Sequence, residues 1–409
     1  MEARRDVVER IVRFNAGREP ERLARKYLAM RANPFAFFRG TAHLFWDDWA
    51  AAAPALDGAP AAWSCGDAHL ENFGCYRGDN RLAYFDLNDF DEAALAPATR
   101  DPARFLTSVR VASGALGLSA SDATALCRVF LSSYVAALGD GKARWVERAT
   151  AKGMVRELLH GVKRRTREAL LDSHTESDGV RRRIRVDGRH ALALSGDDRD
   201  AVSECFRSLA DAQEDPKFYQ VLDIARRAAG TGSLGVRRFI ILVRGRGSPN
   251  GNVLLNVKEA TPSSLVPSLA ARQPTWRSEA ERVVTLHRRM QAIAPALLHA
   301  VRMGDRHFVV RELQPSEDRL ALEHWHGRLG RLRRVMATMG HVVAWAQLRS
   351  ASRQGAAGVD DLIAFARERT WRRPLHEYAA EYATRVERDW KRFARSRVVA
   401  AKPAGAPGS

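Results

Sequence analysis

The sequence predicts an α+β protein in which a small antiparallel β region packs on a mostly helical region. Helical periodicity dominates both ends of the chain, and β-branched extended runs gather between residues 181 and 315. The 409 residues are 45% hydrophobic and 28% charged, which is ordinary globular composition. These observations exclude a mostly disordered or fibrous chain.

The first 180 residues indicate helices around a short β segment. Residues 1–60 are expected to be helical and include an aromatic run, NPFAFFRGTAHLFWDDW. In residues 62–92, short apolar runs alternate with acidic, glycine-rich turns, which is typical of strands that end in functional loops. Residues 101–172 return to helical periodicity.

From residue 181 the pattern changes to strands. The runs RRRIRV and RHALALS flank Asp187-Gly188 and predict a hairpin. Further strands are expected at 219–228, 236–244, 252–260 and 307–313. A helix is expected at 278–294, with Ser278 as its N-cap, and residues 325–395 are again helical.

These patterns predict one helical lobe built from two parts of the chain. Residues 1–180 form its first part and 316–400 its second. Residues 181–315 form a β-rich lobe inserted between them, and 401–409 a disordered tail.

The charge and cysteine content narrow the cellular setting. No apolar run approaches the roughly 18 residues of a spanning helix, and the N-terminus is too charged for a secretory leader. The four cysteines are scattered, so we expect a cytoplasmic protein with no membrane partner. Arginine supplies 58 of the 66 basic residues behind the net charge of +18, which favours a solvated basic surface over a nucleic-acid partner.

Candidate chemistry concentrates in CGDAHLENFG (65–74) and YFDLNDFDE (84–92). Two carboxylates about 4 Å apart repel by roughly 4 kcal/mol at an effective dielectric of 20, so an acidic cluster favours a cation such as Mg²⁺. Asp67 and Asn72 have the spacing of a kinase catalytic base and metal-binding amide. Asn72, Asp86 and Asp89 are therefore the candidate metal ligands. The alternative is an exposed acidic loop paired with arginines.

The second candidate region is a GxGxxG pattern, Gly230-Thr231-Gly232-Ser233-Leu234-Gly235. A strand follows it where a dinucleotide-binding fingerprint would open a helix, and a third strand then carries Lys258. This order is typical of a kinase glycine loop over ATP phosphates, with Gly230, Gly232, Ser233, Gly235 and Lys258 as nucleotide ligands. A plain hairpin turn and a surface lysine are the alternatives. Glu281 is favoured slightly over Glu279 as the helix carboxylate that pairs with Lys258.

As a set, NPFAFFRG, CGDAHLENFG, FDLNDFDE, GTGSLG, NVKEA and VRELQPSEDRL resemble an uncharacterised bacterial family, domain of unknown function 2252. That family resembles the protein-kinase-like fold, nearest to aminoglycoside and choline phosphotransferases. The resemblance implies a two-lobe fold with Asp67 as catalytic base, His69 as a loop-shaping residue, Asn72 and Asp86 as metal ligands and Lys258 on the phosphates. The motif order is permuted, because the catalytic loop here precedes the glycine loop.

The function expected from these residues is ATP- and Mg²⁺-dependent phosphoryl transfer to an unknown small-molecule or protein hydroxyl. Asp67, His69 and Lys258 are the catalytic candidates. A nucleotide-binding pseudokinase or an AMP-transferring module is the alternative. A metal-dependent phosphoesterase, suggested by Asp67-Ala68-His69, and a nucleic-acid-binding protein are less favoured.

Overall fold

The computed structural model describes residues 6–53, 56–188, 190–194, 196–227, 235–315 and 319–399. It is α+β, with 49% helix, 16% strand and small antiparallel sheets, so the predicted class is confirmed. Within these ranges no helix is both long enough and apolar enough to cross a membrane. The predicted tail, 401–409, lies outside them. The lobe boundaries at 180 and 315 stay a prediction.

Four helices open the chain: α1 (Val7–Phe14), α2 (Pro20–Arg31), α3 (Pro34–Gly40) and α4 (Ala42–Ala52). The side chain of Asn33 caps α3 by accepting the N–H of Ala36 at 2.8 Å. The aromatic run on α3 and α4 is buried as expected, and it packs against α13 (Arg372–Arg395). Phe45, for example, lies 4.7 Å from the ring of Tyr382.

Two pairs of strands follow: β1 (Ala61–Ser64) with β4 (Ala94–Pro97), and β2 (Phe73–Arg77) with β3 (Ala83–Leu87). Both pairs are antiparallel. The loop from β1 to β2 and the loop from β3 to β4 therefore emerge at the same end, where the N–H of Asn88 donates to the carbonyl of Asn72 at 3.0 Å. This pairing brings the two acidic segments of the sequence together.

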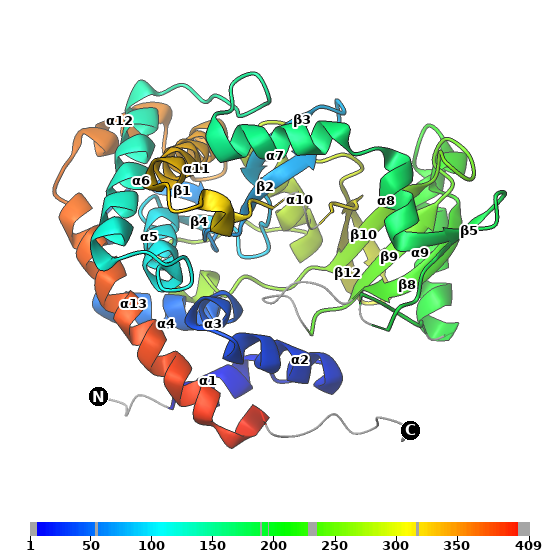
Figure 1. The fold of residues 1–409 in the computed structure, drawn as a ribbon, viewed down its shortest axis with the longest axis horizontal. Coiled ribbons are helices and arrows are strands. Elements are labelled where there is room, and N and C mark those ends of the chain that lie inside the picture. The colour runs from blue at the N-terminus through cyan, green and yellow to red at the C-terminus, as the bar shows by residue number, and fades with distance from the viewer. Residues whose placement is uncertain are drawn as a thin grey trace.

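The remaining helical part surrounds these strands, as Figure 1 shows. Its helices are α5 (Arg100–Ala112), α6 (Ala120–Asp140), α7 (Gly153–Arg164), α11 (Leu329–Ser350), α12 (Val359–Arg367) and α13. Helix α8 (Arg167–His174) lies apart from them, against β5 (Thr175–Ser177). Helices α6 and α11 pack closely at Gly340, where a Cβ would come within 2.4 Å of the carbonyl oxygen of Phe130. Gly340 is thus required for helix packing.

A six-stranded antiparallel sheet lies at the other end of the molecule (Figure 1), in the order β11-β12-β10-β9-β8-β7. Its strands are β7 (Ala191–Leu192), β8 (Val221–Arg227), β9 (Arg238–Val243), β10 (Val253–Glu259), β11 (His299–Met303) and β12 (Arg306–Glu312). One face carries Phe239, Ile241 and Leu255 and packs on α9 (Gly196–Asp211). The other, inner face carries Ile240 and Leu242.

Two sequence predictions in this region were wrong. The run at 182–184 forms β6 (Arg182–Ile184), which pairs with β5 (Thr175–Ser177) and not with the segment after Asp187-Gly188. The turn that joins β5 to β6 is built by Asp178, whose carboxylate accepts the N–H groups of Val180 and Arg181. Helix α9 was not predicted, although Val202, Phe206 and Leu209 have helical spacing.

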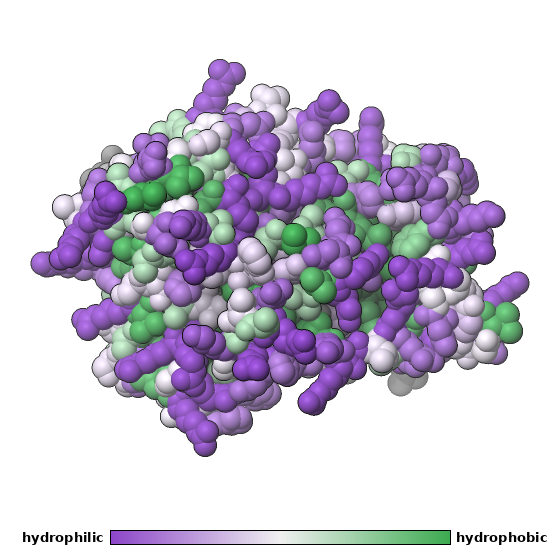
Figure 2. Space-filling model, turned by 90° about the horizontal axis from the view of Figure 1, so that it is seen from above, coloured by the Kyte–Doolittle hydropathy of each residue, from purple (hydrophilic) through white to green (hydrophobic). Residues whose placement is uncertain are grey.

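The helix expected at 278–294 is α10 (Glu279–Met290), and its predicted cap is confirmed. Ser278 Oγ accepts the N–H of Glu281 at 3.1 Å. On the face of the molecule seen in Figure 2, hydrophilic side chains dominate and apolar residues form separate small patches. Such a surface is ordinary for a globular protein.

Candidate active site

The loop from β1 to β2 is held in shape by the buried carboxylate of Asp101, at the start of α5. This carboxylate accepts the hydroxyl of Ser64 at 2.6 Å and the N–H groups of Cys65 and Gly66 at 2.9 and 3.1 Å. Gly66 has a φ of +76°, and a Cβ there would come within 2.0 Å of the Glu92 carbonyl oxygen. The turn therefore requires glycine, and it presents Asp67 beside the second loop.

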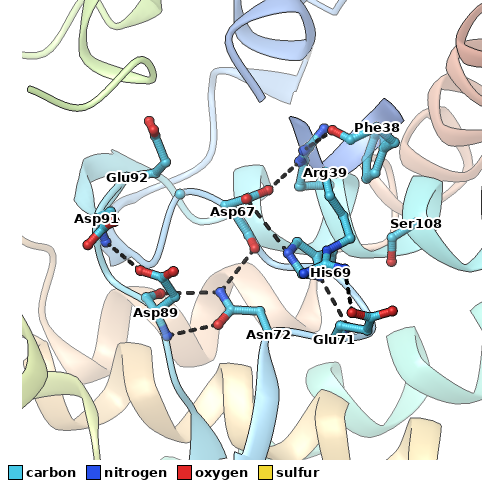
Figure 3. Close-up of polar contacts among 12 residues, drawn as sticks. Phe38, Arg39, Asp67, His69, Glu71, Asn72, Asp89, Asp91, Glu92 and Ser108 are labelled. Carbon is cyan, nitrogen blue, oxygen red and sulfur yellow. Dashed lines mark hydrogen bonds and ion pairs between the residues drawn. The ribbon is translucent and has the colours of Figure 1, made fainter. Parts of the chain in front are cut away.

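Asp67 pairs with a buried arginine, Arg104, and lies near His69, as Figure 3 shows for the histidine. Arg104 Nε, on α5, donates to Asp67 Oδ1 at 2.8 Å, and the Arg104 side chain is fully buried. His69 Nδ1 accepts the N–H of Glu71 at 3.1 Å, so the ring proton lies on Nε2, 3.7 Å from Asp67 Oδ2. Burial, with Arg39 and Arg104 nearby, lowers the pKa of His69 well below its ordinary value. His69 is therefore a neutral ring that shapes the loop through Glu71, and it lies too far from Asp67 for a hydrogen bond.

Asn72 ties the two loops together (Figure 3). Its side-chain nitrogen donates to the carbonyls of Asp67 and Asp89 at 3.0 and 3.2 Å, and its side-chain oxygen accepts the N–H of Asp89 at 2.8 Å. The Asn72 side chain is buried. In this arrangement Asn72 fixes the position of Asp89 relative to Asp67.

Lys258, on β10, reaches both acids of the second loop. Its Nζ lies 3.4 Å from Asp89 Oδ2 and forms a shorter ion pair with Asp91. Lys258 is far from these acids in the sequence, and only 12% of its side chain is exposed. The sheet and the β3–β4 loop therefore meet at one cluster of charged groups.

The protonation of this acidic pair is set by burial and by the neighbouring charges. Burial disfavours ionisation of both carboxyls. Lys258 and Arg311 nonetheless hold the pKa of Asp89 well below its usual range. Burial and the adjacent Asp89 raise the pKa of Asp91 above its ordinary value, although Lys258 opposes this. Asp89 is thus the member of the pair that stays ionised most readily.

The inner face of the sheet continues this cluster with further cations. Arg238 lies directly opposite Lys258 in the pairing of β9 with β10. Asn256 Oδ1 accepts hydrogen bonds from Arg227 and Arg238 at 2.8 and 2.6 Å, and Arg311 donates to the Asn88 carbonyl at 3.0 Å. Burial and the charge of Arg311 lower the pKa of Arg238 to about 10. Like charges directly opposite each other are unfavourable, so this face suits an anion.

The structure does not bring Asp86 into the cluster. Its carboxylate is 4% exposed and faces α11, where Arg349 lies 3.1 Å away, and it also accepts the N–H groups of Leu87 and Ala292. Asp86 lies within strand β3, whereas Asp89 lies in the loop beyond it. The geometry therefore separates the two predicted metal ligands and leaves Asp89 beside Asp67.

Glu281 is likewise not brought to Lys258. Its carboxylate accepts the N–H of Arg277 at 2.7 Å, at the start of α10. Arg282, one residue further along, donates to the carbonyls of Asp91, Ala93 and Thr261. Helix α10 thus contacts the acidic loop through an arginine, and Asp91 takes the place that was predicted for a helix glutamate.

Three of the predicted glycine-loop residues, Gly230, Gly232 and Ser233, lie outside the described residues. Gly235 is described, with a φ of +99°, and the side chain of Arg18 approaches it closely. The carbonyl of the next residue, Val236, accepts a hydrogen bond from Arg22 at 2.8 Å. The N-terminal helices therefore contact the strand end that follows the loop.

Two cavities adjoin the cluster. A small one of 80 Å³ is lined by residues that include Asp67, Asp89, Asp91, Glu92 and Lys258. A larger one of 920 Å³ lies against the inner face of the sheet and includes Arg227, Ile240, Arg311 and Leu313. The larger volume is within the range of about 300–1,000 Å³ that is typical of small-molecule sites.

Sequence reasoning had not committed to Arg104, Asp91 or Glu92 as site residues. Asp91 and Glu92 belong to the acidic run already singled out, and their proximity to Asp89 was a usable signal. Arg104 is one of 58 arginines, and nothing in the sequence distinguishes the arginine that reaches Asp67.

The chain was compared with known proteins. The family model described as an uncharacterized protein conserved in bacteria (DUF2252) matches residues 18–396. The chain belongs to this family. The match spans every residue of the cluster around Asp67 and Lys258. No curated protein and no solved structure matches the chain.

Proposed function

We propose that this DUF2252 protein is a kinase-like phosphotransferase that moves a phosphoryl group from Mg-ATP to a hydroxyl acceptor. The contact of Lys258 with Asp89 and Asp91, beside Asp67 and Asn72, carries the proposal. A phosphate-binding lysine, a metal-binding acid and a base are the groups that kinases assemble around ATP. Here they come from chain segments that are distant in sequence.

The order of elements around Lys258 supports a kinase-like nucleotide lobe. Strand β8, the segment with the glycine pattern, β9, β10 with Lys258 and then α10 follow one another along the chain. In protein kinases the lysine also lies on the third strand and a helix next to the sheet follows. Asp89-Phe90-Asp91 begins as the kinase D-F-G motif does, and the ring of Phe90 lies 4.5 Å from that of His287 on α10.

The nucleotide is expected to lie along the inner face of the sheet. Ile240 and Leu313 offer an apolar surface for a base in the 920 Å³ cavity. Arg227 and Arg311 line the same cavity and lie between this apolar part and Lys258. Their positive charge favours the phosphate chain, which would run from the cavity toward Asp89.

The oxygen donors at the cluster suit Mg²⁺. Among the described residues, no group of three or more histidine, cysteine or acidic side chains forms a ready metal cage. Mg²⁺ commonly takes one or two protein carboxylates and completes its shell with water and phosphate oxygens. Asp89, with Asp91 beside it, would hold such an ion, which would neutralise charge on the phosphates. Asn72 holds Asp89 in place.

Asp67 is the expected proton acceptor. As the terminal phosphorus–oxygen bond of ATP breaks, ADP leaves with the electron pair. The acceptor hydroxyl oxygen bonds to phosphorus, and its proton passes to Asp67. Arg104 holds the carboxylate in position. Such positioned proton transfer contributes about 10²- to 10⁴-fold to a rate.

The test uses the full chain with labelled ATP and separate measurements of binding and transfer. Asp67→Ala should abolish γ-phosphoryl transfer while nucleotide binding persists. Lys258→Met should weaken Mg-ATP binding, which a thermal shift reports because ligand at about 100 times its dissociation constant adds about 2.7 kcal/mol of stability. The exposed Lys217, changed to methionine, is the matched control and should behave as wild type.

Undiminished transfer by Asp67→Ala would refute the proposed role of this residue. Equal Mg-ATP binding by the Lys258→Met and Lys217→Met variants would refute the nucleotide site itself. If the acceptor gains label from the α-phosphate of ATP and not from the γ-phosphate, the same residues transfer AMP instead of a phosphoryl group.

A nucleotide-binding module without transfer is the second candidate, and the engagement of Asn72 favours it. The side-chain oxygen of Asn72 already accepts the N–H of Asp89, and Asp67 is paired with Arg104. A tight Mg-ATP complex that transfers neither label to any acceptor would decide for this module.

A further inference from the structure

The cavity beside Asp67 has a second side, which the N-terminal helices contribute. His43, on α4, lines this 80 Å³ cavity and is only 4% exposed. Its ring stacks on Phe14 with centroids 3.8 Å apart. Within the described chain, neither of its ring nitrogens has a hydrogen-bond partner. A buried polar group without a partner is unfavourable, so the position of His43 requires an explanation.

Two arginines beside Asp67 show the same feature. Arg39, on α3, pairs with Glu71 through Nη1, but its buried Nε has no acceptor among the described residues. Arg104 binds Asp67 through Nε and the Phe38 carbonyl through Nη2, yet its Nη1 is also buried without an acceptor in that part of the chain. Among the described residues, three side chains that share the cavity with Asp67 or bind it thus keep a buried nitrogen without a hydrogen-bond partner.

The charges around the cavity differ according to the elements that supply them. The N-terminal segment contributes Arg18, Lys26, Arg39 and His43, whereas the two loops contribute acids, Asp67, Asp89, Asp91 and Glu92. A metal-bound phosphate group has the matching chemistry, because its cation suits the acids and its oxygens suit the donors. The volume of 80 Å³ is far below the roughly 300 Å³ of a typical small-molecule site, so the cavity suits one such group and not a nucleotide.

We propose that His43 and Arg39 form an oxyanion site that binds the phosphoryl group as it passes from ATP to the acceptor. The proposal rests on the proposed function for the identity of the group, and it assigns to the N-terminal helices a direct part in the reaction. His43 donates one ring N–H and Arg39 donates its Nε–H to phosphoryl oxygens. Burial, with Lys26 and Arg10 nearby, lowers the pKa of His43 well below its ordinary value, so the ring is a neutral donor.

The proposal also explains the motif NPFAFFRG, which has no part in the nucleotide site around Lys258. NPFAFFRG places Arg39 within an apolar run, where an unpaired charge is costly. The Arg39 side chain is 14% exposed, and its partner Glu71 belongs to the same loop as Asp67. A position on the phosphoryl group gives Arg39 a second anionic partner.

The test measures binding of inorganic phosphate, with Mg²⁺ present, to the full chain by calorimetry. His43→Phe keeps the stacking on Phe14 but removes both ring nitrogens. We expect phosphate affinity to fall about 10-fold or more and the unfolding midpoint without ligand to stay equal or rise, because an unsatisfied polar group is removed. Arg39→Lys keeps the charge but removes the Nε–H, and it should weaken phosphate binding by a similar factor.

His376→Phe on α13 is the matched control, since His376 Nδ1 is also buried without a partner among the described residues but lines neither cavity of the cluster. It should leave phosphate affinity unchanged. Wild-type affinity in both His43→Phe and Arg39→Lys would overturn the proposal, as would a lack of phosphate binding by the wild-type protein. A lower midpoint with unchanged phosphate affinity in His43→Phe would mark the residue as structural.

The outcomes separate this site from the nucleotide site. If Mg-ATP binding depends on Lys258 but phosphate binding and the transfer rate are insensitive to His43 and Arg39, the oxyanion site is refuted and the proposed function stands. If phosphate binding depends on His43 while Mg-ATP does not bind, the ATP-dependent function is refuted, and His43 and Arg39 remain a phosphate site without a role in transfer from ATP.

Discussion

Asp101 is expected to be the strongest single support of the loop from β1 to β2, and Asp101→Ala tests this. The residue is fully buried at the start of α5, where the helix dipole favours a negative charge. Its carboxylate is the acceptor for the Ser64 hydroxyl and for two consecutive backbone N–H groups, those of Cys65 and Gly66. Alanine would remove this acceptor from all three donors, of which the Gly66 N–H keeps a second acceptor, Ser64 Oγ at 3.1 Å.

The magnitude follows from these three contacts. A buried donor left unsatisfied costs about 1–3 kcal/mol. Loss of the buried carboxylate offsets part of this cost, because burial raises the pKa of Asp101 and so makes its charged form unfavourable. We expect the free energy of unfolding to fall by about 3–5 kcal/mol, a large part of the roughly 5–15 kcal/mol of a typical protein. Asp101→Asn keeps one carbonyl acceptor and should lose about half as much.

Denaturation in urea at neutral pH measures these losses. Asp122→Ala serves as the comparison, because Asp122 is also an acid in the first turn of a helix but forms an ordinary capping box with Ser119. Its loss should be about 1 kcal/mol. A value for Asp101→Ala within about 1 kcal/mol of wild type would show that the loop does not depend on this carboxylate.

Three further predictions concern Gly66, the two acids Asp86 and Asp89, and the pH dependence of stability. Gly66→Ala should lower the free energy of unfolding by more than about 2 kcal/mol, because the positive φ alone costs about 1–2 kcal/mol and the Cβ meets the Glu92 carbonyl; urea denaturation measures it. Asp86→Asn should cost about 3 kcal/mol, because it removes the carboxylate that pairs with Arg349 and leaves this arginine with neutral acceptors such as the carbonyls of Met290 and Arg144. It should keep any Mg²⁺ dependence of nucleotide binding, whereas Asp89→Asn should remove that dependence in the same thermal-shift assay. Asp101 should make stability fall as pH rises, because an acid with a raised pKa in the folded state stabilises it fully only below its unfolded pKa and loses that contribution as pH passes the folded value. Asp67, Asp86, Asp91 and Glu92 act in the same direction, whereas Asp89 and the buried histidines with lowered pKa values, among them His43, His69 and His287, act in the opposite one. The difference in unfolding midpoint between wild type and Asp101→Asn isolates the first effect, and it should shrink as pH rises through the mildly acidic range.

Local pattern was enough to predict most elements of the fold. The strands β8, β9, β10 and β12 follow from apolar, β-branched runs, and Ser278 indicated the start of α10. Helix α9 was missed although its buried residues, Val202, Cys205, Phe206, Leu209 and Ala210, follow helical spacing. Extended runs dominate the sequence on both sides of it, and they led to a prediction of strands for the whole region.

The failed hairpin shows what local pattern cannot decide. Asp178-Gly179 and Asp187-Gly188 carry the same turn dipeptide, and the sequence offers no reason to prefer one of them. Tertiary contacts make the choice, since Asp223 on β8 accepts the N–H of Ile184 at 2.9 Å and holds β6 against the sheet. A contact between residues so far apart in the sequence cannot be predicted from the pattern of a short segment.

At the site, spacing indicated Asp67, Asn72 and Lys258, which the structure places around one cluster. Spacing could not separate Asp86 from Asp89. Two acids three residues apart differ in direction according to where the strand ends, and β3 ends at Leu87, between them. The partner of Lys258 was likewise assigned to a helix on the kinase pattern, whereas the nearer loop supplies Asp91.

The permuted chain order gives the proposed oxyanion site a structural origin. Because the loop that carries Asp67 comes early in the chain, α2, α3 and α4 precede it, and α3 packs against α5, which carries Arg104. The same helices contact the sheet, where Arg22 binds the Val236 carbonyl and Glu19 pairs with Arg226. A segment that is fixed to both sides of the cleft can hold Arg39 and His43 over Asp67 with little freedom, and transition-state stabilisation depends on donors fixed in this way. The Glu19–Arg226 ion pair is part-exposed and joins the N-terminal helices to the sheet that carries Lys258. Loss of this pair should therefore lower the rate of phosphoryl transfer while it changes the free energy of unfolding only slightly.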